Sequence, residues 1–556
     1  MSRPAGFLQQ TGAWVNRCSG WLMLVFTSGY LVVAIATLPA YGMTWDEGLG
    51  NFFFGERYLF YLTTFNGKYL DFKADLASLA GYPLHLFLSP LHNFPHEFPA
   101  FFDTLSAGAM HLLAYRFQWL GAVDAFHLPT VLVAALLLLA LYCFAAPRLG
   151  MTAAWFGTLL LAFTPRFWAD LHFNVKDIPE MVFFSLTILS FTGWLERPTR
   201  WRALRSGLAF GAAIAIKANG WFLPIVLLAG LLPWSLRWRD WLGLVQHLFQ
   251  RSSDYVLMGL SGVGVLLLSW PYLYDNPLHI RNYLSYILSQ GERSGTNTWS
   301  WQPVKMISAV LPEILLIFLL TGIAITVYRA ATRRGTIHRL LLVWCLLPVL
   351  RISLPGMVNF DGIRHFIEFL PAACLLAGIG IQALIERAER ISRLVQAIST
   401  AGLAGWLAFS TLLVWQGYGP YQHVYFNRLW DGLPAAAGRF GQAEATDYWG
   451  ATYRQGMNWL SDQAPHGASV YVPLARWLVE LPAPLWLRED LRLLPADETP
   501  VLEDTIPPTY VMFITRPEAE NEITRFCQDN LQAVYQVTAE GTALLKIYRL
   551  DRSKGN

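Results

Sequence analysis

Residues 21–40 read WLMLVFTSGYLVVAIATLPA, and the chain continues over residues 41–47 as YGMTWDE. The first stretch is apolar and long enough to cross a bilayer as a helix. Two adjacent carboxylates, Asp46 and Glu47, follow where the chain would leave the membrane. A carboxylate near lipid is costly unless it is paired or used. This stretch therefore predicts a membrane span with an acidic site at its boundary.

The composition of the whole chain supports a membrane protein. Of 556 residues, 54% are hydrophobic and only 14% are charged, and the mean hydropathy is +0.36. These values exclude an ordinary soluble protein, and the net charge of +3 gives no support for nucleic-acid binding. The five cysteines are scattered without the spacing of a disulfide framework or a metal site.

Apolar windows of about twenty residues predict a polytopic α-helical membrane protein with about eleven spans. The windows lie at 21–40, 128–146, 150–165, 180–195, 206–218, 220–236, 255–272, 307–328, 339–355, 364–384 and 398–416.

Alternate loops between these windows are rich in arginine, which indicates the orientation. They contain Arg148 and the runs ERPTRWRALR, RWRD, RRGTIHR and ERAERISR. The positive-inside rule then places these loops and the N-terminus in the cytoplasm. An odd number of spans leaves the C-terminus outside, so we expect a multi-pass protein of the cell (inner or plasma) membrane whose TWDE motif faces outward.

Two domains are expected. Residues 1–416 form the transmembrane domain, with a long first outer loop at 41–127 and a surface helix at 105–121. In residues 417–556 the hydropathy falls, and short β-like runs appear, such as ASVYVPL, TYVMFIT, LQAVYQV and ALLKIYRL. These runs predict a small extracytoplasmic α/β domain.

Helix capping explains part of the acidic pattern. Thr44 and Glu47 have the spacing of a capping box, which leaves Asp46 surplus. A second box, Asp177 with Glu180, is expected to begin the fourth span. That box does not account for the neighbouring polar side chains His172, Asn174 and Lys176.

Cations at the same predicted face of the membrane, the outer one, complete a candidate anion-binding site. Lys217 lies in an apolar hairpin, where it needs a partner or must snorkel to the interface. The loop MVNFDGIRHFIEF adds Asp361, Arg364 and His365, of which Asp361 and Arg364 could simply pair. Carboxylates and cations at helix ends suit a phosphate-bearing lipid and an activated hydroxyl.

The ordered motifs over about residues 20–416 resemble the GT-C class membrane glycosyltransferases, in particular glycosyltransferase family 39. This family includes protein O-mannosyltransferases and aminoarabinose transferases that modify lipid A. The similar features are WDE after the first span, HEFPAFF before a surface helix, Asp177, and GIRH followed by FIEFLPA. The sequence departs from the family at HEFPA, where paired prolines are usual and Glu97 adds a charge. The later region from YQHVYFNRLWDG through DYWGATYRQGMNWL resembles a signature of one bacterial subgroup, without an assigned role.

The resemblance implies transfer of a sugar from a polyprenyl-phosphate donor to an acceptor hydroxyl on the outer face, with inversion. It implies Asp46 as the general base, supported by Glu47, and Asp177 as a residue that binds the acceptor or orients a cation. The implied phosphate-binding residues are Lys176, Lys217, Arg364 and His365, and the residues that shape the site or bind the acceptor are His172, Asn174 and Asp361.

The implied partners are the membrane, the lipid-linked sugar and an acceptor that is a protein, a lipid or a glycan. No DxD motif is present, so no metal ligand is predicted and no cofactor is identified, while a divalent metal stays open. The alternative function is a transporter or flippase of a lipid-linked sugar. Transporters tend to contain repeated halves, and no halves repeat in this sequence.

Overall fold

A computed structural model describes residues 5–72, 98–232, 238–294, 297–331, 335–357, 359–495, 498, 500 and 508–550. His96 and Glu97 of the HEFPAFF motif lie outside these residues.

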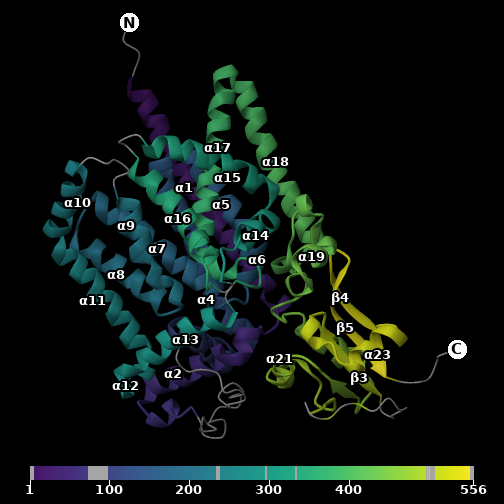
Figure 1. Ribbon diagram of the computed structural model, residues 1–556. Helices are drawn as coiled ribbons and strands as arrows, with labels where there is room; N and C mark the ends of the chain where they lie inside the picture. Colours follow the sequence, from purple (N-terminus) through teal and green to yellow (C-terminus); the bar gives the residue numbers. More distant parts are fainter. Residues whose placement is uncertain are drawn as a thin grey trace.

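The first part of the chain is helical (Figure 1). Its helices are α1 (Ala5–Thr37), α2 (Phe52–Thr64), α3 (Phe101–Met110), α4 (Ala122–Leu149), α5 (Met151–Ala162), α6 (Pro165–Asp170), α7 (Asp177–Glu196), α8 (Arg200–Ile214), α9 (Leu223–Leu231), α10 (Trp238–Gln250), α11 (Ser252–Ser269), α12 (Tyr272–Asp275), α13 (Ile280–Ser294), α14 (Gln302–Val310), α15 (Glu313–Ala331), α16 (Thr336–Ser353), α17 (Leu370–Ile391) and α18 (Arg393–Tyr418).

Eight helices in the described part of the chain are long and apolar enough to span a membrane. They are Ser19–Ala40, Ala122–Leu149, Asp177–Glu196, Ser252–Ser269, Glu313–Ala331, Thr336–Ser353, Arg364–Ile391 and Arg393–Tyr418. Two predicted windows, 150–165 and 220–236, correspond to the shorter apolar helices Met151–Ala162 and Ala218–Leu231. The window 206–218 falls largely in α8, which begins with RWRALR and is therefore only partly apolar. The prediction of a polytopic helical membrane protein is confirmed.

Small residues let α17 lie at the centre of the helical body. A Cβ atom at Gly378 would lie 2.3 Å from the carbonyl oxygen of Ala153 in α5. A Cβ atom at Gly322 in α15 would lie 1.7 Å from the carbonyl oxygen of Leu376. Glycine at these positions allows the backbones to approach closely, as in many membrane helix pairs. The central position of α17 fixes the 3₁₀ turn before it, which carries Arg364.

The segment between the first two spans is largely helical where it is described. The chain forms a π-helical turn over Glu47–Asn51, then α2, which packs on α3. The predicted surface helix begins four residues earlier than expected, at Phe101, and its helical path ends at Arg116.

The C-terminal region contains the predicted α/β domain. Its elements are α19 (Gly432–Phe440), α20 (Tyr453–Gln463), β1 (Ser469–Tyr471), α21 (Trp477–Glu480), α22 (Ala483–Trp486), β2 (Arg492–Leu493), β3 (Thr509–Ile514), α23 (Glu522–Asn530), β4 (Tyr535–Ala539) and β5 (Thr542–Leu550). The sheet has the order β2-β1-β3-β5-β4, in which β1 is parallel to β2 and β3, and β5 is antiparallel to β3 and β4. Each of the four β-like runs of the sequence overlaps one of these strands.

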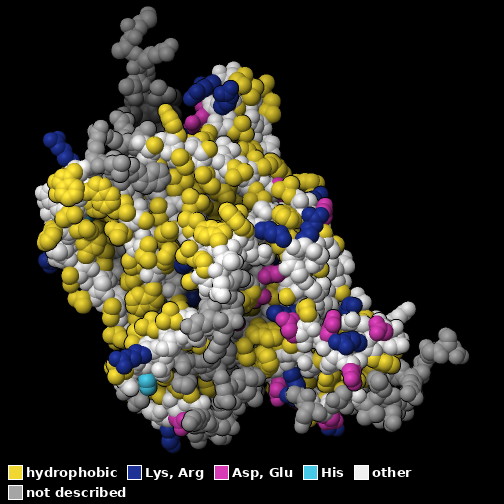
Figure 2. All heavy atoms as spheres, in the orientation of Figure 1, with side chains coloured by type: hydrophobic (Ala, Val, Ile, Leu, Met, Phe, Trp, Pro, Cys, Tyr) yellow, Lys and Arg dark blue, Asp and Glu magenta, His cyan; other side chains and the backbone are white. Residues whose placement is uncertain are grey.

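The sheet lies beside the end of the helical body that is opposite the N-terminus (Figure 1). Figure 2 shows hydrophobic side chains over most of the helical body and a mixture of acidic and basic side chains over the C-terminal lobe. This distribution is typical of a bundle in lipid with a domain in water.

Candidate active site

Arg364 joins carboxylates from three separate segments. Its Nε donates to Asp177 Oδ2 at 3.0 Å, and its Nη1 donates to Asp361 Oδ2 at 3.2 Å. Its Nη2 donates to Asp46 Oδ2. The planar guanidinium can serve several acceptors in a fixed geometry, which a lysine cannot do. We call Asp46, Asp177, Asp361, Arg364 and Lys217 the Arg364 cluster.

Asp177 is the buried anchor of this cluster. Lys217 Nζ donates to its Oδ1 at 2.7 Å, and Asn174 Nδ2 donates to its Oδ2 at 2.9 Å. The structure therefore gives Lys217 the partner that an intramembrane cation needs. Asn174 Oδ1 also accepts from the backbone N–H of Asp177, the first residue of α7, at 2.8 Å.

The predicted capping pair of Asp177 and Glu180 is wrong. The side chain of Asp177 faces the cations, and Glu180 is buried in the region of Glu368. Asn174, three residues before Asp177, instead contacts both the carboxylate and the backbone N–H of Asp177, because its amide can donate and accept.

The capping role of Glu47 is confirmed. Glu47 Oε2 accepts from the backbone N–H and the hydroxyl of Thr44, at 2.7 and 2.8 Å. Its Oε1 lies 2.8 Å from Nε2 of the buried His127. These contacts occupy Glu47 in the protein interior, so it supports the turn that presents Asp46.

Asp46 is the accessible carboxylate of the cluster. Its side chain is 36% exposed, compared with 1% for Asp177 and 10% for Asp361. No described residue forms a hydrogen bond with Asp46 Oδ1. The cluster therefore offers one carboxylate oxygen to a ligand while Arg364 holds the other.

The C-terminal region supplies contacts that the sequence interpretation missed. The Arg364 guanidinium lies 4.1 Å from the ring centroid of Trp449, whose carbonyl oxygen accepts from the backbone N–H of Trp45 at 2.8 Å. Glu444 accepts from the backbone N–H groups of Asp361 and Gly362 at 3.0 and 2.8 Å. Trp449 belongs to the run DYWGATYRQGMNWL, so its family resemblance was the available signal.

Burial raises the pKa of two acids near Arg364. The pKa of Asp361 is about 6 because burial outweighs the attraction of Arg364. The pKa of Asp170, at the end of α6, is about 7 because of burial and the nearby charge of Asp177. Both groups can change protonation near neutral pH. The sequence analysis did not single out Asp170.

Several predicted residues lie around the cluster rather than in it. His172 is buried, and its ring contacts the Trp168 carbonyl oxygen at 2.7 Å and the Thr37 hydroxyl at 2.9 Å. Burial lowers the pKa of His172 to about 3, so it is neutral and joins α1 to α6. The ring of His365 packs edge-on against Phe360.

Lys176 faces a different acid. Its Nζ lies 3.7 Å from Asp103 Oδ2 and 5.1 Å from the ring centroid of Phe98. Burial raises the pKa of Asp103 to about 6. Lys176 is 20% exposed, as is Lys217, so both cations are accessible from solvent. Within the described ranges, no group of three or more His, Cys, Asp and Glu side chains could hold a metal ion.

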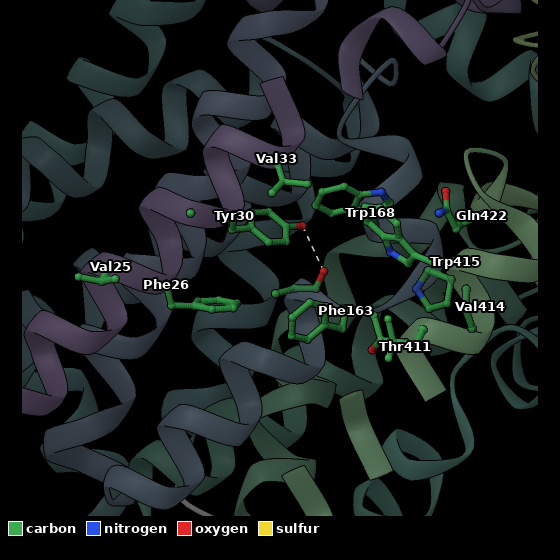
Figure 3. A pocket seen from close by; sticks show the side chains of 14 residues that line it. Val25, Phe26, Tyr30, Val33, Phe163, Trp168, Thr411, Val414, Trp415 and Gln422 are labelled. Carbon is green, nitrogen blue, oxygen red and sulfur yellow. Dashed lines mark hydrogen bonds between the residues drawn. The ribbon is translucent and has the colours of Figure 1, made fainter. Parts of the chain in front are cut away.

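An apolar groove of about 480 Å³ lies between α1, α5, α6 and α18 (Figure 3). Tyr30 crosses it and donates to the carbonyl oxygen of Ala162 at 3.1 Å, and Trp168 and Trp415 lie side by side at its wall. Its polar end is Gln422, whose Oε1 lies 3.4 Å from the Tyr41 hydroxyl. This contact places the polar end of the groove beside Tyr41, which precedes the TWDE motif in the sequence.

Comparisons with known proteins agree with the fold. Residues 121–250 match the family described as dolichyl-phosphate-mannose-protein mannosyltransferase. No curated protein sequence matches the chain. The structure is similar to ArnT from Cupriavidus metallidurans bound to undecaprenyl phosphate, with a TM-score of 0.50 and 15% identity over 96% of this chain and 99% of that one.

Two further solved structures are similar. The apo state of the same ArnT gives a TM-score of 0.50 and 15% identity, covering 97% of this chain and 99% of ArnT. The oligosaccharyltransferase of Archaeoglobus fulgidus gives 0.44 and 12%, covering 88% and 69%. The chain has the ArnT fold and matches the mannosyltransferase family over residues 121–250, which confirms its resemblance to GT-C class membrane glycosyltransferases.

Proposed function

We propose that the protein is an integral-membrane glycosyltransferase that moves a sugar from a polyprenyl-phosphate donor to an acceptor hydroxyl on the outer, periplasmic face. Asp46 is the general base. The observation that carries this proposal is the position of Asp46, the exposed carboxylate of a cluster whose other acids are buried. The family match and the fold support the class of reaction.

The proposed step uses both oxygens of Asp46. Arg364 holds Oδ2, and Oδ1 accepts the proton of the acceptor hydroxyl. The acceptor oxygen then forms a bond to the anomeric carbon as the bond from that carbon to the phosphate oxygen breaks. The electron pair of the broken bond leaves with the polyprenyl phosphate, and the configuration inverts.

Lys217 and Arg364 are proposed to bind the departing phosphate, with Lys176 as a further accessible cation. The cluster holds three carboxylates and two cations, so it has an excess of negative charge when all groups are ionised. Asp361 has a pKa of about 6, so protonation would neutralise part of this charge just below neutral pH. Its neutral form would free part of Arg364 for the phosphate.

Asp177 is proposed to orient the two cations, because it is buried and contacts both of them. The chain of the lipid donor is proposed to occupy the apolar groove of Figure 3, whose lining suits an isoprenoid. Gly29 lines this groove, and a Cβ atom there would meet no atom within 4 Å. Gly29→Leu should therefore fill the groove and raise KM for the donor with little change in stability.

The test uses the purified full-length protein with undecaprenyl-phosphate mannose and undecaprenyl-phosphate aminoarabinose as donors and with detergent-extracted envelope as acceptor. We expect release of undecaprenyl phosphate together with labelled sugar on an acceptor. Movement of intact labelled donor across a proteoliposome membrane, without release of undecaprenyl phosphate, would instead identify a flippase and overturn the proposal.

A further inference from the structure

A second cavity, which is polar, lies at the end of α7 that is remote from Asp177. It has a volume of about 550 Å³ and is formed by the last turns of α4 and α7 and the first turns of α8. Since α7 has 20 residues, its two ends are about 30 Å apart. The cavity and the Arg364 cluster therefore lie near opposite faces of the membrane.

The cavity is strongly basic. Its charged lining consists of one glutamate and four arginines, namely Glu196, Arg148, Arg197, Arg202 and Arg205. The glutamate is already paired, because Arg148 Nε and Nη2 donate to its two oxygens at 2.7 and 2.5 Å. Three arginines thus remain without a carboxylate partner among the cavity residues.

Two of these arginines contact other groups of the protein. Arg202 Nη1 donates to the carbonyl oxygen of Gly193 at 2.7 Å. The Arg205 guanidinium lies 5.7 Å from the ring centroid of Trp201, which is 62% exposed. An exposed tryptophan beside arginines at a span end is typical of a membrane–water interface.

We propose that this cavity, the arginine pocket, binds a phosphate-bearing anion, with the phosphodiester head group of an anionic membrane lipid as the expected source. Guanidinium groups bind phosphate oxygens through paired hydrogen bonds. Basic pockets between membrane helices are suited to such head groups. The pocket also spans the ends of three helices, so an occupant would join α4, α7 and α8.

Space inside the pocket allows a test that leaves every charge in place. Gly193 lines the cavity, and a Cβ atom there would meet no atom within 4 Å. Gly193→Leu should fill the cavity, and Arg205→Gln should remove one of its cations. Arg200→Gln is the matched control, because Arg200 is an exposed arginine of the same helix outside the cavity.

Binding to the purified full-length protein would be measured by native mass spectrometry with dioleoyl phosphatidylglycerol, dioleoyl phosphatidylcholine and inorganic phosphate in turn. We expect phosphatidylglycerol to bind about fivefold to tenfold less tightly to Arg205→Gln than to the wild type and Arg200→Gln, on the scale of one basic residue at an anionic surface. Gly193→Leu should also weaken this binding, because the leucine side chain fills the space for the head group. Phosphatidylcholine binding should be the same for all four proteins.

The two sources of phosphate give different results. Binding of phosphatidylglycerol but not of inorganic phosphate would assign the pocket to a lipid, whereas binding of inorganic phosphate that both pocket variants weaken would assign it to a soluble phosphate ligand. Equal binding of both probes to all four proteins would overturn the proposal. Thermal unfolding of each variant without added lipid shows that the fold is retained.

Discussion

Arg364→Lys tests whether one guanidinium organises the site. The substitution keeps the positive charge but replaces a rigid three-way donor with a single ammonium group. Arg364 donates to three carboxylates, of which Asp361 is 10% exposed and has no second cation within hydrogen-bond distance among the described residues. We therefore expect the contact with Asp361 to be lost and Asp46 to shift.

The contacts of Arg364 determine how much stability and how much kcat the Arg364→Lys variant should lose. A hydrogen bond to a buried charged group contributes about 1.5–3 kcal/mol, and the stacking on Trp449 about 1 kcal/mol. The contact with the partly exposed Asp46 contributes less because water screens it. The expected loss of stability is thus about 2.5–4 kcal/mol, and a base displaced by about 1 Å costs about 100-fold in kcat.

The assay compares kcat for sugar transfer and the thermal unfolding midpoint of purified proteins. Arg454→Lys is the matched control, since Arg454 is also buried and holds Asp124 at 2.5 and 3.3 Å. It should lose similar stability and retain its kcat. If Arg364→Lys transferred sugar as fast as Arg454→Lys, the reasoning that Arg364 positions Asp46 would be refuted.

Three further predictions concern neighbouring residues. Burial raises the pKa of Asp170 to about 7, so the folded chain keeps a proton that the unfolded chain loses near pH 4. The contribution of Asp170 to stability should therefore be full below about pH 4 and be lost as the pH rises through 7, and Asp170→Asn should reduce the fall in the thermal unfolding midpoint between pH 5 and 8. Trp449→Phe should keep most of the transfer activity because an aromatic ring still faces Arg364, whereas Trp449→Ala should lower kcat about tenfold. Equal kcat values for the two variants would show that the ring at position 449 does not position Arg364. Glu47→Gln should lower the unfolding free energy by about 1 kcal/mol. Sugar transfer should continue, because the amide oxygen of glutamine can still accept from the backbone N–H of Thr44. A complete loss of transfer at normal stability would instead show that Glu47 takes part in the chemistry.

The sequence predicts the fold class and part of the site because local patterns determine both. Apolar windows mark the spans, and alternating runs mark the strands. The acidic and basic residues at one set of span ends, such as Asp46, Asp177 and Arg364, meet because those ends share a face. Lys217 was expected to need a partner, and it has one in Asp177.

The features of the site that the sequence does not predict depend on contacts between residues far apart in the chain, and no local sequence pattern encodes such contacts. Trp449 reaches Arg364 from 85 positions along the chain because the C-terminal region docks on the span ends. Glu180 has the spacing of a cap, yet its side chain is buried near Glu368, and the start of α7 has no side-chain cap. His172 sits among site residues in sequence but points toward α1, where it contacts Thr37.

The central claim is that Asp46 accepts the proton of the attacking hydroxyl, and Asp46→Asn tests it most directly. The amide keeps the shape of the side chain and an oxygen for Arg364 but removes the basic carboxylate, and the partial exposure of Asp46 limits the effect on folding. Single-turnover transfer from undecaprenyl-phosphate sugar should fall by about 100-fold or more, while the unfolding midpoint stays near that of the wild type. Transfer by the folded Asp46→Asn protein at close to the wild-type rate would contradict the account.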